Sequence, residues 1–313
     1  MIAKIFSKTN PLHYVFMGFW VVVLYFVYIP HTTVWDNKAI NIAYRILLVV
    51  LLLGSVLLSD FITHKNNLTK NNNYSLLLFA VFTFMFPSIL LNDKVIISNF
   101  FLLLALRRII SLQSLLHSKE KIFDASLWIV VASLFHFWCL LYFILVFIAI
   151  LSHVSRDYRN WLVPLFAVFT VGIVYAMVDI QFDFENAKTL ESKTYFSFDF
   201  TYFENIYQHL AFGVFTSITL LIFTTQFADL GNKPLSIQAT YKKIVVAFVI
   251  GIAIYVFSAH KNNSFLAYSF APLSIMGTNL IENIKVKWIK EISLYLLVLV
   301  SLFFFFMNYS LLP

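Results

Sequence analysis

The segment 124–151, DASLWIVVASLFHFWCLLYFILVFIAIL, decides the membrane topology that we predict for this chain. It is too long for one membrane crossing, which needs about 20 apolar residues, and too short for two, which need about 40. We therefore predict a re-entrant helical hairpin that turns near Phe135-His136-Phe137 and leaves on the side it entered. Each arm would hold about 12–13 residues and reach ~18–20 Å. The alternative is one long tilted helix that crosses once.

Composition places the rest of the chain in the membrane as well. Of the 313 residues, 61% are apolar and only 12% are charged, whereas soluble globular domains contain about 45–50% and about 25%. The mean hydropathy is +0.84. These proportions exclude a soluble globule, a disordered chain, a collagen and a coiled coil. The class predicted is an all-α, polytopic transmembrane helical bundle that forms a single domain over residues 1–313.

Nine apolar runs have the length of a membrane-spanning helix. They fall near 14–30, 41–59, 74–91, 95–112, 161–178, 206–227, 244–259, 265–281 and 292–312. The first run lacks a small-x-small cleavage site, so we expect it to remain as a signal anchor. We predict about nine spans plus the hairpin.

Lysine and arginine distribution favours the hairpin over the single long helix. With the hairpin, these residues divide 16 on one side against 5 on the other, leaving out Arg45 inside its span. With a single crossing the division is 11 against 10. Because cytoplasmic loops carry an excess of positive charge, the amino terminus is predicted to be cytoplasmic and the loop 179–205 external. The formal net charge of +7 then suits anionic inner-leaflet lipid, and a nucleic-acid partner is not needed.

Three arginines stand in or at the ends of apolar runs. Arg45 lies near the external face, where it either binds a substrate phosphate or extends its side chain to the interface. Arg107 and Arg108 close another run, and they are either inner-face anchors or a guanidinium clamp on phosphate. Adjacent helical residues diverge by ~100°, so at most one of this pair can face a cavity.

His136 is the candidate catalytic residue of the hairpin tip, as a general base. The alternative is a neutral imidazole packed among Phe135, Phe137 and Trp138. Asp36, beside Trp35 in the first external loop, is a second catalytic candidate of the kind that membrane glycosyltransferases carry. In the external loop 179–205, acids and aromatic residues such as Asp199 and Tyr202 are candidates for binding sugar rings. That loop has an alternative role as an interfacial aromatic belt.

Several catalytic and binding motifs are missing from the sequence. There is no P-loop, no G-x-G-x-x-G, no H-E-x-x-H and no G-x-S-x-G. The single cysteine, Cys139, cannot form an intrachain disulfide, and no ligand set surrounds His136 at metal-binding spacing. We therefore expect no cofactor and no metal. Membrane lipid is the expected partner, with membrane-protein partners left open.

Two family resemblances follow from short stretches of sequence. The opening MIAKIFSKTNP, together with Ala105–Arg108, Lys121–Ala125, Asp157–Trp161 and Lys261–Ser264, resembles an uncharacterised family of integral membrane proteins from flavobacteria and relatives. Arg107, followed by ASLFH at 132–136, is similar to the EpsG and Wzy-like polysaccharide polymerases. Phe137-Trp138 replaces the small polar residues that usually follow that histidine.

The first family has no established activity, and the second resemblance implies a bacterial inner-membrane protein of cell-envelope glycan assembly. On this hypothesis it handles a polyprenyl-linked glycan, as a glycosyltransferase or polymerase. A non-enzymatic scaffold or accessory subunit, and a lipid or metabolite carrier, are the alternatives.

Overall fold

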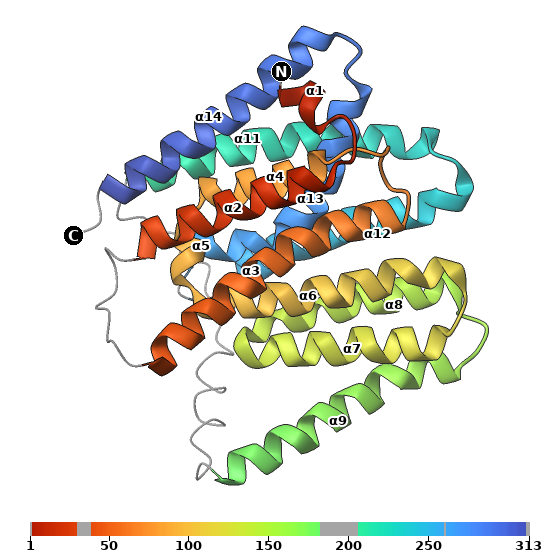
Figure 1. The fold of residues 1–313 in the computed structure, drawn as a ribbon. Helices are drawn as coiled ribbons and strands as arrows, with labels where there is room; N and C mark the ends of the chain where they lie inside the picture. The colour runs from red at the N-terminus through yellow and green to blue at the C-terminus, as the bar shows by residue number, and fades with distance from the viewer. Residues whose placement is uncertain (1, 30–38, 182–205, 260, 311–313) are drawn as a thin grey trace.

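The protein is all-helical in the computed structural model, which describes residues 2–29, 39–181, 206–259 and 261–310 (Figure 1). The chain begins with the short helix α1 (Ile2–Phe6). The longer helices are α2 (Pro11–Tyr28), α3 (Ala39–Lys65), α4 (Tyr74–Met85), α6 (Asp93–Ser111), α7 (Ser118–Phe135), α8 (Tyr142–His153), α9 (Arg159–Gln181), α11 (Ile206–Asp229), α12 (Leu235–Phe257), α13 (Ala267–Asn283) and α14 (Lys287–Ser310). Short helical turns join them at α5 (Ser88–Leu91), η2 (Leu112–Ser114), η3 (Phe137–Leu141), η4 (Leu230–Asn232) and η5 (Asn263–Leu266).

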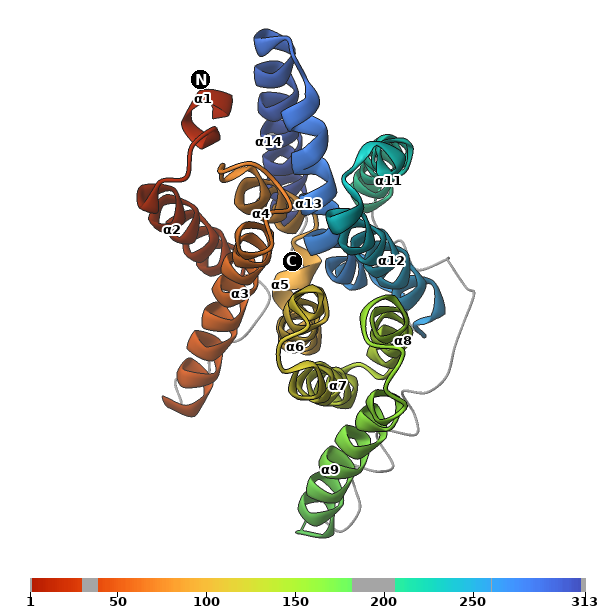
Figure 2. The same ribbon diagram turned by 90° about the vertical axis from the view of Figure 1, so that its right-hand side faces the viewer.

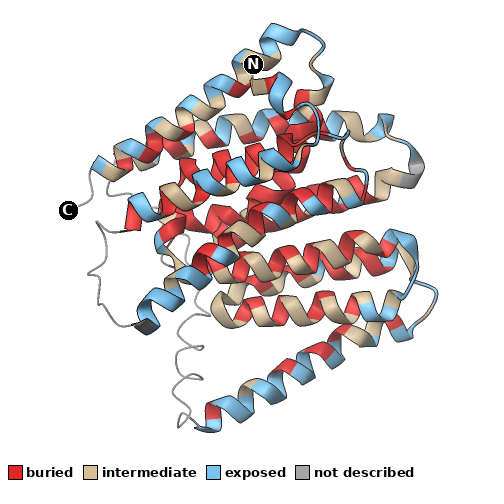
Figure 3. Ribbon diagram, in the orientation of Figure 1, coloured by how far each residue is buried: buried red, intermediate tan, exposed pale blue. Residues whose placement is uncertain are grey.

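Eight of the described helices are long and apolar enough to cross a membrane. Their outer faces are apolar, as hydrocarbon requires: on α9, for example, Phe166 and Phe169 are more than 60% exposed. In Figure 3 the exposed residues concentrate on α9, α11, α14 and α2, at the periphery of the bundle. The predicted class, a multi-pass membrane protein built of helices, is therefore confirmed.

One predicted span is wrong as a continuous helix. The run 74–91 is divided into α4 and α5 at Phe86-Pro87. Proline lacks the backbone N–H that an α-helix needs and disfavours the helical conformation of the residue before it. Accordingly Phe86 has φ −125° and ψ 75°, outside the helical region. The other eight predicted runs each correspond to one of the eight candidate spans.

The segment 124–151 is not one long helix, so that alternative is wrong. Helix α7 ends at Phe135, and His136 has an extended backbone with φ −140° and ψ 105°. Figure 1 shows the chain reversing here, so that α7 and α8 run back along each other. The reversal falls at the predicted residues, but α7 begins at Ser118 and is 18 residues long. Its length is about 27 Å, longer than the predicted arm.

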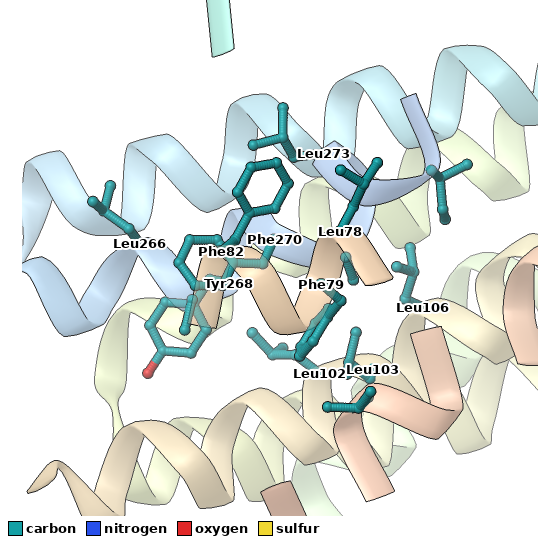
Figure 4. Close-up of a cluster of buried hydrophobic side chains, with 14 of the residues drawn as sticks. Leu78, Phe79, Phe82, Leu102, Leu103, Leu106, Leu266, Tyr268, Phe270 and Leu273 are labelled. Atoms are coloured by element: carbon teal, nitrogen blue, oxygen red, sulfur yellow. The ribbon is translucent and has the colours of Figure 1, made fainter. Parts of the chain in front are cut away.

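The core centres on α4 and α13, which the other helices surround (Figure 2). Every residue of α4 is buried. The ring of Phe270 on α13 meets Phe79 and Phe82 of α4 at centroid distances of 6.3 and 5.8 Å. Figure 4 shows these rings among Leu102, Leu103 and Leu106 of α6 and further leucines. Aromatic pairs of this kind contribute about 0.5–1.5 kcal/mol beyond burial of their area.

Helix α13 also carries polar residues that link it to its neighbours. Ser274 contacts Ser59 of α3 at 3.2 Å, and Asn279 donates to Gln226 of α11 at 3.3 Å. Tyr268 shares a 2.7 Å hydrogen bond with Ser98 of α6. Paired polar groups between helices are tolerated in a membrane, whereas unpaired ones are costly. These bonds set the register of the helices around α13.

The two ends of the bundle differ strongly in charge. We call the end where α2, α4, α7, α9, α12 and α14 begin the basic end; it lies on the right in Figure 1. Sixteen lysines and arginines belong to this end. The described part of the opposite end holds three: Arg45, Lys94 and Lys261. The helices therefore separate lysine and arginine between the two ends as the sequence analysis predicted for the hairpin.

Candidate functional site

His136 lies at the opposite end of the bundle, in the break between α7 and η3. Its N–H donates to the Ala132 carbonyl at 3.0 Å, which closes α7, and its own carbonyl accepts from Cys139 at 3.0 Å, which opens η3. An extended residue between two helical segments turns the chain while both segments keep their backbone hydrogen bonds. The half-buried side chain is thereby placed where α7 meets η3 and α12.

The imidazole of His136 is held in a defined orientation. Its Nε2 lies 2.9 Å from Oγ of Ser258, and that hydroxyl donates its single proton to the Ile254 carbonyl at 2.5 Å. This arrangement favours the tautomer in which Nε2–H donates to Ser258, with Nδ1 as the basic nitrogen of the ring. The ring also packs on Phe265 and Tyr268, at centroid distances of 4.6 and 5.5 Å.

Interrupted helices meet around this histidine. Ser258 follows the last residue of α12, and η5 precedes α13. Lys261, which is 4% exposed, places Nζ 3.4 Å from the Ser258 carbonyl, so a buried cation stands beside the partner of His136. The buried Nε1 of Trp138 has no hydrogen-bond partner, and its ring stacks on Phe257 at 5.5 Å. Non-helical backbone and unpaired donors at the end of a membrane bundle are features of binding sites.

Arg45 lies at the same end of the bundle, on the second turn of α3. Its guanidinium is 3.5 Å from the carboxylate of Asp93, the first residue of α6. Both side chains are about a quarter exposed, so the pair stands at the rim of this end. The neighbouring Asn92 donates to Ser264 at 3.0 Å, which connects the start of α6 to η5 beside His136.

Arg107 and Arg108 are not brought together with His136, because they occupy the last turn of α6 at the basic end. Arg107 stacks over the ring of Phe61 at 4.8 Å, whereas Arg108 pairs with Asp124 of α7 at 2.8 Å. The two side chains diverge as their helical spacing requires. Each has a local partner that suits an anchor at the membrane face.

The remaining sequence candidates lie outside the described residues: Asp36 in the first loop, and Asp199 and Tyr202 in the loop predicted over 179–205. The helix ends that flank these segments, at α2, α3, α9 and α11, all lie at the end of the bundle that holds His136 (Figure 1).

A buried acidic residue was missed by the sequence analysis. Asp60 of α3 is 0% exposed, and its Oδ2 accepts from the Tyr14 hydroxyl of α2 at 2.6 Å. Nε2 of His64, one turn further along α3, is 3.4 Å from the same oxygen, while Oδ1 has no partner. The signal was present in LLSDFITHK at 57–65, where Asp60 and His64 are spaced i, i+4. The apolar run predicted over 41–59 stops just before Asp60, and the sequence analysis gave this residue no role.

Among the described residues, no group of three or more histidine, cysteine or acidic side chains is arranged to hold a metal ion.

The helices, their apolar outer faces and the polar contacts of α13 define a multi-pass helical membrane protein. The chain belongs to DUF6427, a family of unknown function, whose match extends over residues 1–312. The prediction of an uncharacterised family is thus confirmed. No curated protein and no solved structure matches the chain.

Proposed function

We propose that the protein acts on a lipid-linked sugar at the end of the bundle that holds His136, with the basic end in the cytoplasm. The observation that carries the proposal is the His136 site itself. It combines an oriented imidazole with a buried lysine, and Arg45 lies at the same end of the bundle. The resemblance of residues 132–136 to polysaccharide polymerases supports the same substrate class, a polyprenyl-linked glycan of a bacterial inner membrane.

The charge distribution supports the orientation. Sixteen lysines and arginines at the basic end match the cytoplasmic side under the positive-inside rule. On this orientation α7 and α8 form a pair that enters from the cytoplasm and returns to it. The ~27 Å length of α7 then brings His136 close to the outer leaflet, where polymer assembly takes place.

The chemistry of glycosyl transfer assigns a role to each of these residues. Transfer from a polyprenyl pyrophosphate forms a bond from the acceptor hydroxyl to the sugar and breaks the bond from the sugar to the pyrophosphate. Nδ1 of His136 would take the proton of the acceptor hydroxyl. Arg45 or Lys261 would stabilise the negative charge of the leaving pyrophosphate. Arg107 and Arg108 lie too far along α6 for this task.

The test is complementation of a deletion strain with variants, followed by measurement of polyprenyl-linked oligosaccharide. We expect the deletion to cause accumulation, His136→Ala to restore turnover about 10²–10⁴-fold less well than the wild type, and Arg45→Leu to be impaired. His117→Ala is the matched control, because this histidine is exposed at the basic end and pairs only with Glu120. Unchanged lipid-linked pools in the deletion strain would refute the proposal.

A non-enzymatic scaffold is the second candidate, and the filled core favours it. Every residue of α4 is buried, and so is 94% of the apolar 18-residue stretch that includes most of α13. A scaffold predicts that His136→Ala and His117→Ala complement equally well, provided that both variants reach the membrane in wild-type amounts.

A further inference from the structure

An apolar groove runs between α2, α4 and α14 at the periphery of the bundle. Its volume is about 560 Å³, within the range of about 300–1,000 Å³ that ligand pockets have. The floor is formed by α4 with Leu77 and Val81, and the walls by residues such as Trp20 of α2 and Val298 of α14. From Leu12 to Leu24 of α2 the groove extends about 18 Å. A hydrocarbon chain fits this shape and this chemistry.

The groove is closed at the basic end by α1. Three hydrogen bonds hold α1 in place: Tyr74 donates to the Ala3 carbonyl at 2.6 Å, the Asn73 N–H to the Phe6 carbonyl at 3.0 Å, and the Ala3 N–H to Glu291 at 3.1 Å. Ile2, Ile5 and Phe6 of α1 line the groove. Backbone atoms of α1 make all three bonds, so this five-residue helix is a fixed end wall held by α14 and by the start of α4.

Polar groups gather at this closed end. Asn10 and His13 are part of the lining, and both contact Oδ1 of Asn73: the Asn10 N–H at 3.1 Å and His13 Nδ1 at 3.2 Å. Asn73 is 0% exposed, and its side chain also interacts with the Tyr14 hydroxyl, so it belongs to the packing between α2 and the start of α4. Asn10 and His13 are therefore the polar residues that this end of the groove itself offers to a headgroup.

Lysines neighbour the residues that line this end, although none of them is part of the lining. Lys4 and Lys8 are exposed, on α1 and just after it, and Nζ of Lys290 lies 4.7 Å from the centroid of the Tyr74 ring, whose hydroxyl holds α1. Two acids lie among these lysines: Glu291, which accepts from the Ala3 N–H, and Glu282, which accepts from the Lys70 N–H at 2.9 Å. This end therefore has more lysines than acids near it, whereas the remaining length of the groove is apolar.

A second groove lacks the polar end that distinguishes the groove between α2, α4 and α14. It lies between α11 and α12, has a volume of about 410 Å³, and is lined by apolar side chains and two threonines, Thr216 and Thr219. No lysine, arginine or histidine is part of its lining. It can hold hydrocarbon, but it offers nothing that recognises a charged headgroup.

We infer that the groove between α2, α4 and α14 is a binding site for an anionic phospholipid, with one acyl chain in the groove and the phosphate at Lys4, Lys8 and His13. Burial of the chain contributes in proportion to its CH₂ groups, and the lysines select an anionic headgroup. The site lies at the basic end, away from His136, so the inference stands apart from the proposed function.

The test uses the full-length protein, purified in detergent and delipidated, with dioleoyl phosphatidylglycerol and dioleoyl phosphatidylcholine as probes in native mass spectrometry. We expect one phosphatidylglycerol to bind per chain, at least about tenfold more tightly than phosphatidylcholine. The double variant Lys4→Glu/Lys8→Glu should weaken phosphatidylglycerol binding by about thirtyfold and leave phosphatidylcholine nearly unchanged.

A second variant tests the groove itself. Val298→Trp places an indole in the groove and should weaken both lipids, whereas Leu299→Trp, one residue along α14 and 65% exposed, is the matched control. Equal binding of the two lipids to the wild type would overturn the inference. So would wild-type binding by the lysine double variant, whose substitutions are exposed and leave the core intact.

Discussion

Asp60 shows what a single residue contributes inside this bundle. A carboxyl group buried among membrane helices is costly unless it is paired, and such residues face partners or cavities. Asp60 is paired on one oxygen, with Tyr14 and His64, and unpaired on the other. Its neighbour Ser59 opens a chain of hydroxyl contacts through Ser274 and Ser75. The cluster joins α2 to the core, because Tyr14 is the α2 side chain that reaches it.

We predict that Tyr14→Phe lowers the free energy of unfolding by about 1–3 kcal/mol, since it removes a hydrogen bond to a buried carboxyl group and leaves that oxygen less well satisfied. Thermal unfolding of the purified protein in detergent measures the effect. Tyr158→Phe is the control, because Tyr158 is 70% exposed. Equal unfolding temperatures for the two variants would show that the Tyr14 bond contributes nothing.

At the scale of elements, the contact between α12 and α13 depends on a glycine. A Cβ atom at Gly251 would lie 2.8 Å from the Tyr268 carbonyl oxygen and 2.9 Å from the Ser269 nitrogen. Both are backbone atoms, which cannot move aside as a side chain does. Close approach through a small residue is the usual way in which membrane helices pack. Here it also positions Tyr268, the residue that stacks on His136.

Gly251→Ala is therefore expected to destabilise the protein by about 1–3 kcal/mol, because α12 and α13 must separate to admit the methyl group. Gly213→Ala in α11 is the matched control, since nothing lies within 4 Å of the position of its Cβ. There alanine should be neutral or stabilising by up to about 1 kcal/mol. Thermal unfolding of both variants decides the matter, and a Gly251→Ala protein as stable as Gly213→Ala would contradict the packing argument.

For the whole molecule, the difference in charge between its two ends is the property from which we predict its orientation in the membrane. We predict that, in a Cys139→Ser background, Ser155→Cys in the turn after α8 resists membrane-impermeant thiol reagents added outside intact cells. Lys94→Cys, at the start of α6, should react with them. Both positions are exposed. This follows from the proposed orientation, in which the basic end lies in the cytoplasm under the positive-inside rule.

Labelling after cell lysis is the control for this experiment, because both cysteines should then react. External labelling at position 155 in intact cells would reverse the assigned orientation. It would also place His136 on the cytoplasmic face.

Much of the architecture could be predicted from the sequence, because hydrocarbon imposes a simple rule on it. A helix that spans a membrane must be long and apolar, so eight of the nine predicted runs coincide with helices that are long and apolar enough to cross one. The reversal at His136 followed from the length of its segment and the distribution of lysine and arginine. The division of 74–91 was missed despite Pro87, because the hydropathy of a run does not register a break in its backbone.

The candidate site was less predictable. His136, Arg45, Arg107 and Arg108 were each chosen as polar residues in apolar surroundings. The sequence predicted Arg45 and the Arg107–Arg108 pair at opposite faces, and helix direction agrees, because α6 carries Arg107 and Arg108 to the basic end. His136 was predicted only at the tip of a short hairpin, and the full length of α7 is what takes it to the end that holds Arg45. Ser258 and Lys261, more than 120 residues away along the chain, were not predictable as neighbours of His136.

The sequence by itself determined the apolar surroundings of the chain, the positions of eight long apolar helices and the basic character of particular segments, because these depend on composition and on local order along the chain. Only the tertiary structure decided which polar side chains meet. Contacts such as Tyr14 with Asp60 and His136 with Ser258 depend on how each helix is rotated and paired, and apolar patterns hardly constrain rotation when lipid and protein interior are equally apolar.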